Sequence, residues 1–137
     1  SWLCANGRVA ESLEWLGRAI ADPAYPTPAL ALANAGNCAQ RAGQAERAEA
    51  SWRQALALDP VSSPALSGMA ALKFASGQYM DARAFTERWL ATTPDDPEGL
   101  RLAIQVEQKL GDTAAASRYL LRLQAIPSGS GPAPRTQ

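Results

Sequence analysis

Residues 43–48 read Gly-Gln-Ala-Glu-Arg-Ala, and the pattern of a glycine followed five positions later by an alanine recurs twice. The later copies are Gly77-Gln-Tyr-Met-Asp-Ala82 and Gly111-Asp-Thr-Ala-Ala-Ala116. The three glycines are equally spaced, and a period of about 34 residues is typical of one class of helical repeat. A glycine suits the end of a helix because it adopts a left-handed conformation without a Cβ clash. An alanine suits a close helix crossing, so the pattern predicts repeated helix pairs.

Other residue types recur in the same phase. A leucine precedes each glycine at a constant distance, and a proline follows the first two glycines at a constant distance, whereas the third proline comes one position early. These positions are Leu32, Leu66, Leu100, Pro60, Pro94 and Pro127. Prolines between helices stop one helix or begin the next. We predict helix pairs at about 27–41 and 45–57, 63–75 and 79–92, and 95–109 and 113–124, after a helix at about 8–21.

The predicted fold class is all-α, a right-handed tetratricopeptide-repeat superhelix of antiparallel helix pairs with about three and a half repeats. Residues 1–126 would form this domain, and residues 127–137 have the composition of a disordered tail. Residues 1–6 supply only the last turn or two of a first helix, so the first repeat is incomplete. We expect either that the natural chain extends upstream or that a second copy covers the gap.

Composition argues against several classes of function. Thirteen basic and thirteen acidic residues cancel, and no basic run is present, so we expect no nucleic-acid partner. Histidine is absent, which removes the commonest general base and the commonest zinc ligand. We therefore expect a protein that is not an enzyme, with no catalytic, metal or cofactor site. The acidic residues Asp95, Asp96 and Glu98 could form a metal site, but the interpretation we prefer is that they favour a helix N-terminus.

A protein-binding groove is the main candidate site, because first helices of successive tetratricopeptide repeats line one surface. Carrying the repeat positions over gives ten candidates: Asn37, Gln40, Arg41, Ser67, Ala71, Phe74, Arg101, Gln105, Gln108 and Lys109. The alternative is an ordinary solvated helix face. Trp15, Trp52 and Trp89 recur at a constant interval close to the period and are predicted to be interhelical core, the alternative being partial exposure toward a partner.

Several strings resemble the PilF/PilW-type family, the pilotins of type IV pilus biogenesis and stability. They are Leu3-Cys4 with Gly7, Asp22-Pro-Ala-Tyr-Pro-Thr-Pro28, Asn34-Ala-Gly-Asn-Cys38, Met69-Ala-Ala-Leu-Lys-Phe74, Asp81-Ala-Arg83 and Leu110-Gly-Asp112, with Ser117 and Tyr119. The resemblance covers roughly residues 2–126. It implies a periplasmic lipoprotein on the inner leaflet of the outer membrane that helps the pilus secretin to reach that membrane and assemble. The lipid anchor is expected upstream, and this segment itself is not expected to contact the membrane.

An oxidising periplasm would suit a disulfide between Cys4 and Cys38, the alternative being two buried thiols. The leading functional hypothesis is an adaptor that binds a segment of the secretin or another pilus-assembly component. The second hypothesis is a scaffold or regulatory tetratricopeptide-repeat segment of a larger cytoplasmic protein.

Overall fold

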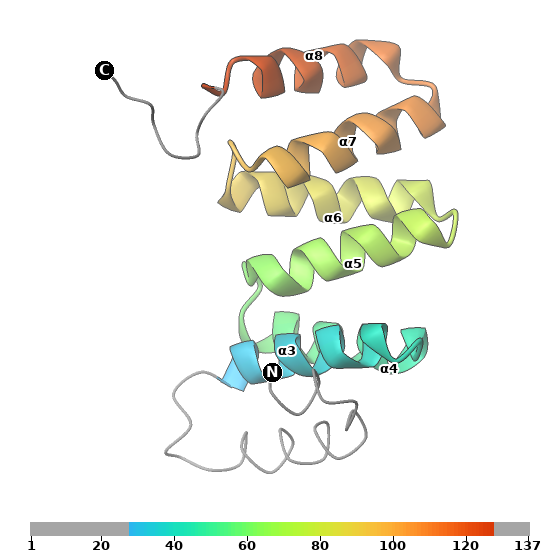
Figure 1. Cartoon of the computed structure of the whole chain (residues 1–137), viewed down its shortest axis with the longest axis vertical. Helices are drawn as coiled ribbons and strands as arrows, with labels where there is room; N and C mark the ends of the chain where they lie inside the picture. Colours follow the sequence, from blue (N-terminus) through green and yellow to red (C-terminus); the bar gives the residue numbers. More distant parts are fainter. Residues whose placement is uncertain (1–27, 128–137) are drawn as a thin grey trace.

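The computed structural model describes residues 28–127, which form six helices arranged as three antiparallel pairs. The helices are α3 (Pro28–Arg41), α4 (Ala45–Leu58), α5 (Ser63–Ala75), α6 (Tyr79–Thr92), α7 (Pro97–Leu110) and α8 (Thr113–Gln124). Figure 1 shows them following one another from α3 and α4 at one end to α8 at the other. The fold is the predicted all-α repeat superhelix. The expected helix at 8–21, the incomplete first repeat and residues 128–137 lie outside the described residues.

The turn inside each pair has the predicted left-handed glycine. The φ angles of Gly43, Gly77 and Gly111 are +75°, +77° and +80°. At the first of these turns the Gln44 N–H donates to the Ala39 carbonyl at 2.9 Å, which closes the helix end. Among the described residues, apart from the adjoining ones, no atom lies within 4 Å of a Cβ placed on these glycines, so the backbone conformation, not crowding, requires them.

Polar caps and prolines begin two of the helices. Ser62 accepts a hydrogen bond from the Ala65 N–H before α5, and the Asp96 side chain accepts one from the Glu98 N–H at 3.0 Å before α7. Because Asp96 is the cap, α7 begins at Pro97, two positions later than the expected start at 95. The preferred interpretation of this acidic stretch is confirmed for Asp96.

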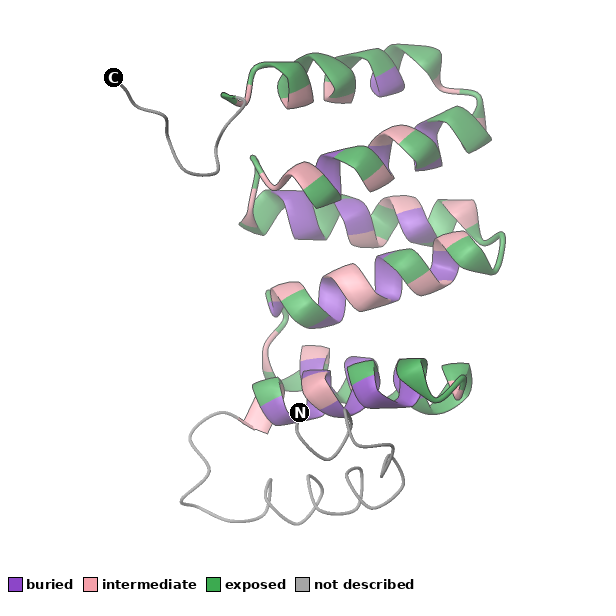
Figure 2. Cartoon of the chain, in the orientation of Figure 1, coloured by how far each residue is buried: buried purple, intermediate pink, exposed green. Residues whose placement is uncertain are grey.

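The core follows the repeat, with the periodic leucines and the alanines at positions 48, 82 and 116 all buried. In Figure 2 the buried parts of the ribbon, drawn in purple, recur along the stacked helices. The largest core side chain in the first described junction is Trp52, only 2% exposed, whose Nε1 donates to the Ala33 carbonyl at 3.2 Å. Trp89 is 7% exposed and donates to Asp96 Oδ2 at 3.2 Å. The prediction of interhelical tryptophans is confirmed for both, and Trp15 lies outside the described residues.

The two tryptophans are not repeat equivalents, although their spacing is close to the period. A shift by one period places Thr86 at the position of Trp52, and Trp89 at the position of Ala55. The Trp52 ring is accommodated by two glycines, because a Cβ at Gly36 or at Gly68 would lie 2.4 Å from a ring atom. The junctions therefore share a backbone period but differ in how they are packed.

Candidate functional site

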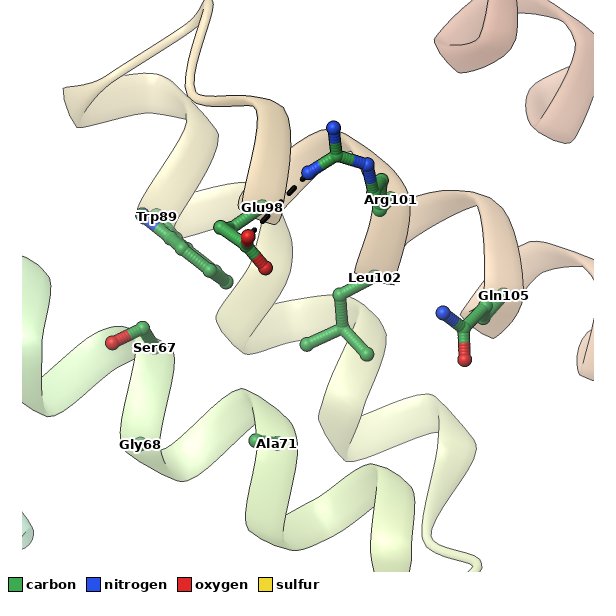
Figure 3. A pocket seen from close by; sticks show the side chains of 8 residues that line it. All are labelled: Ser67, Gly68, Ala71, Trp89, Glu98, Arg101, Leu102 and Gln105. Carbon is green, nitrogen blue, oxygen red and sulfur yellow. Dashed lines mark hydrogen bonds and ion pairs between the residues drawn. The ribbon is translucent and has the colours of Figure 1, made fainter. Parts of the chain in front are cut away.

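A hollow of about 430 Å³ lies between α5 and α7. Ser67, Gly68 and Ala71 of α5 form one wall, as Figure 3 shows. The opposite side and the floor come from α7 and α6: Glu98, Arg101, Leu102, Gln105 and Trp89. The hollow exists because its α5 wall carries only small side chains. At the equivalent positions one repeat later, α7 carries the larger Arg101, Leu102 and Gln105.

The structure brings four of the ten predicted groove residues together at this hollow: Ser67, Ala71, Arg101 and Gln105. The remaining six do not line it. Asn37, Gln40 and Arg41 are exposed on α3, and Gln108 and Lys109 are exposed on α7. Phe74 is half-buried, with its ring centroid 5.5 Å from that of Tyr79. We call the ten positions together the first-helix surface, since all lie on α3, α5 or α7.

Four lining residues were not among the predicted groove positions: Gly68, Trp89, Glu98 and Leu102. Leu102 could have been found from the sequence, because it is the repeat equivalent of Gly68 and the neighbour of Arg101. Trp89 could not, since its place on a second helix predicts core. Although mostly buried, its ring forms part of the apolar floor together with Leu102.

Charges near the hollow are exposed and only loosely paired. Arg101 Nη1 lies 3.4 Å from Glu98 Oε2, and the two side chains are 55% and 80% exposed. An exposed pair of this kind contributes little to stability, and its partners are free to exchange. The first-helix surface carries three basic residues, Arg41, Arg101 and Lys109, and Glu98 is the acidic residue among those lining the hollow.

The two other charged residues inside first helices each pair with a residue of the preceding second helix. Lys73 of α5 donates to Glu49 Oε2 of α4 at 3.1 Å, and Glu107 of α7 binds Arg83 of α6. A hydrogen bond from Arg53 lowers the pKa of Glu49; burial acts in the opposite direction, and a hydrogen bond from Lys73 adds to the lowering. Neither junction belongs to the hollow.

Burial raises the pKa of Tyr119, which also lies away from the hollow. Within residues 28–127, no group of three or more histidine, cysteine, aspartate or glutamate side chains is placed to hold a metal ion. Cys38 is buried in α3, whereas Cys4 lies outside the described residues, so the disulfide stays a prediction. What the hollow offers is an apolar floor with a polar rim that carries one arginine and one glutamate, which is an arrangement for binding.

Comparison with known proteins identifies the repeat. The tetratricopeptide-repeat family profile matches residues 39–105. The crystal structure of PilW, described as a widely conserved type IV pilus biogenesis factor, superposes with a TM-score of 0.77 at 35% sequence identity, covering 91% of this chain and 58% of PilW. PilF of Pseudomonas aeruginosa superposes with a TM-score of 0.76 at 23% identity, covering 93% of this chain and 58% of that one.

Two further relatives show how widely the repeat is used. A tetratricopeptide-repeat protein from Parabacteroides merdae ATCC 43184 superposes with a TM-score of 0.82 at 22% identity, over 94% of this chain and 51% of that chain. Cellulose synthase operon protein C of Pseudomonas fluorescens (strain SBW25) is 27% identical over 116 residues, which is 85% of this chain and 9% of that protein. The chain thus spans little more than half of the three structures and a small part of the cellulose synthase protein. With identities of 22% and 23%, the likeness to the Parabacteroides protein and to PilF shows the fold alone.

Proposed function

The chain is a PilF/PilW-like tetratricopeptide-repeat protein, and from this premise we propose that it is a non-enzymatic adaptor of type IV pilus biogenesis. It binds a segment of the pilus secretin, or of another pilus-assembly component, and holds that segment during assembly. The observation that carries the proposal is the hollow on the first-helix surface, where four predicted groove residues meet. The 35% identity to PilW, a pilus biogenesis factor, supports the pilus as the setting.

Binding on this surface needs little rearrangement, because the elements that form the hollow are fixed by the fold. Trp89 is held by its hydrogen bond to Asp96, and the N-terminus of α7 is fixed by the same carboxylate. Gly99 follows closely and packs against Leu90 and Trp89, where a Cβ would lie 2.9 Å from Leu90 Cδ2. A surface that is already ordered loses little conformational entropy when a partner segment binds. The action is steric: the adaptor presents a rigid template.

The proposal places the protein at the periplasmic face of the outer membrane, with a lipid anchor upstream of this segment. The likeness to PilW, a pilus biogenesis factor, supports a place in the cell envelope. Between residues 28 and 127, no helix combines the length and the apolar character that a membrane crossing requires.

Deletion of the gene tests the function directly. The proposed adaptor predicts that the deletion strain loses detergent-resistant secretin multimers, measured by immunoblot, and surface pili, measured by electron microscopy. Complementation with the full gene should restore both, and so should complementation with Arg118→Gln, a change on the exposed side of α8. Normal secretin multimers together with normal surface pili in the deletion strain would refute the proposal.

A second function is favoured by one observation, the match to a segment that makes up 9% of cellulose synthase operon protein C. It is a scaffold or regulatory role for this repeat segment within a larger cytoplasmic protein. Cell fractionation of the native protein separates the two: recovery with the outer membrane supports the adaptor, and recovery in the cytosol supports the scaffold.

A further inference from the structure

The hollow between α5 and α7 has a chemistry that specifies its occupant more narrowly than a general protein-binding surface does. Resting on the proposed adaptor function, we propose that it is a subsite for one bulky apolar side chain of an extended partner segment, flanked in that segment by acidic residues. The occupant is therefore a short acidic-apolar peptide motif of another protein.

The volume and the floor argue for a bulky apolar side chain. A hollow of about 430 Å³ lies within the range of ligand pockets and has room for on the order of ten water molecules. Water filling it would lie against Trp89, Leu102 and Ala71, which offer few hydrogen-bond partners. Displacing poorly bonded water with an apolar group is favourable, whereas a small or polar side chain would leave the floor wet.

The size of the hollow is maintained by the packing behind it. Gly68 presents only backbone to the hollow, and a Cβ there would lie 2.4 Å from the Trp52 ring. This wall therefore stays bare for a reason that has nothing to do with the ligand. Leu102, which occupies the equivalent position on α7, is half-buried and closes the opposite side.

The rim argues for acidic flanking residues. Arg101 and Gln105 lie one helical turn apart on α7 above the apolar floor. The guanidinium group of Arg101 is contacted only by the exposed Glu98, at 3.4 Å, within the described residues. A carboxylate of the partner can replace Glu98 and accept two hydrogen bonds from the planar guanidinium group. Arg41 and Lys109 add positive charge elsewhere on the first-helix surface, although neither lines the hollow.

Synthetic peptides test the subsite on the full chain. The probe is fluorescein-labelled Ser-Gly-Asp-Phe-Asp-Gly-Ser, compared by fluorescence anisotropy with a copy in which alanine replaces phenylalanine and a copy in which lysine replaces both aspartates. We expect the first peptide to bind at least about tenfold more tightly than either copy, because each copy loses one of the two contacts. Equal binding of all three peptides, or no binding of the first at millimolar concentration, would overturn the proposal.

Three variants locate the contact. Ala71→Leu fills the hollow from an exposed helix position, where leucine is still a good helix former, and should weaken binding about tenfold. Arg101→Gln should weaken it about fivefold, whereas Glu98→Gln should strengthen it by a factor of about two to five, because Arg101 then loses its competing partner. Ala91→Leu, at an exposed position of α6 outside the hollow, is the matched control and should leave affinity unchanged.

General charge attraction would also make Arg101→Gln and Glu98→Gln respond in opposite directions. These two variants therefore indicate a site only if Ala71→Leu, which fills the hollow, also weakens binding. If Ala71→Leu binds the peptide as the unchanged protein does, the subsite is wrong. Circular dichroism spectra confirm that each variant is folded. Secretin multimers in cells report on the adaptor function separately. If the peptide does not bind but the deletion strain still loses its secretin multimers, the subsite is rejected and the adaptor function is kept.

Discussion

Trp52 lies between two glycines from successive repeats, and this contact gives a quantitative test of the packing. A Cβ at Gly68 would lie 2.4, 2.5 and 2.8 Å from three atoms of the Trp52 ring. The ring cannot move toward the other side, because a Cβ at Gly36 would lie equally close to it. Its Nε1 is also held by the Ala33 carbonyl at 3.2 Å. Substituting Gly68→Ala must therefore displace a helix.

The expected cost follows from two opposing effects. Placing alanine for glycine in a helix interior gains about 0.5–1 kcal/mol of conformational free energy. Overpacking a filled core costs about 1–3 kcal/mol, and the fixed ring places this change at the upper end. We expect Gly68→Ala to lower the free energy of unfolding by about 2 kcal/mol, which corresponds to several degrees in the melting temperature of a chain of this size.

A double-mutant cycle isolates the contact. Trp52→Leu alone should cost about 2–4 kcal/mol through lost burial. In that background the ring is gone, so Gly68→Ala should become neutral or stabilising by up to about 1 kcal/mol, a coupling of about 2–3 kcal/mol. Urea unfolding followed by circular dichroism measures each corner of the cycle. Gly77→Ala is the control: its φ of +77° and open surroundings predict about 1 kcal/mol of destabilisation in both backgrounds. An equal cost of Gly68→Ala in both backgrounds would contradict the proposed packing.

Three further predictions concern charged residues. Arg83→Glu should lower the melting temperature by leaving the carboxylate of Glu107, 3% exposed, beside a like charge, and adding Glu107→Arg should recover most of the loss; no recovery would show that the pair is unimportant. The pKa of Glu49 is lowered in the folded chain, so the stabilisation that Glu49 contributes is present above the ordinary value of 4.5 and is lost as the pH falls from there through the lower folded value. Glu49→Gln should therefore make the melting temperature depend less on pH between about pH 5 and pH 3. Arg122→Ala removes a 2.8 Å hydrogen bond to the Pro94 carbonyl and should cost about 1 kcal/mol in urea unfolding, an expectation that an unchanged midpoint would contradict.

The fold was largely predictable because the repeat period is marked by positions that accept few other residue types. Gly43 and its two equivalents require a left-handed conformation, and the buried alanines require small side chains, so both recur visibly in the sequence. The helix boundary that was predicted least well is the start of α7. There Asp95 and Asp96 were both assigned to the helix, whereas Asp96 is the cap. The choice between two adjacent acidic residues as cap depends on backbone angles that sequence does not reveal.

The site was only partly predictable, because a hollow depends on what neighbouring side chains leave empty. Repeat positions placed Ser67, Ala71, Arg101 and Gln105 on one surface, and the structure brings them together. The same positions gave no reason to separate these four from the six that do not line the hollow. The contribution of Trp89 was hidden because its spacing from Trp52, read as a repeat, predicted an equivalent core role.

The positions at which the repeats differ also matter for the fold, because they make each helix fit the neighbouring repeat better than any other repeat. Glu49 of α4 pairs with Lys73 of α5, and at the same positions one repeat later Arg83 of α6 pairs with Glu107 of α7. The contact is the same but the charges are exchanged. Stacking α4 directly on α7, a slip of one repeat, would bring Glu49 opposite Glu107, two like charges.

The same slip would also fail on size, because Trp52 would meet Leu102 where it now meets Gly68, and the ring has no room for a side chain there. The repeat period alone would allow helices to pair with any repeat. Like charges and overpacking both oppose the slipped arrangement, and they do so through different residues on the same two helices. The hollow forms where Leu102 and Gly68 lie on facing helices, so the order of the repeats that these mismatches enforce is also what creates the proposed binding site.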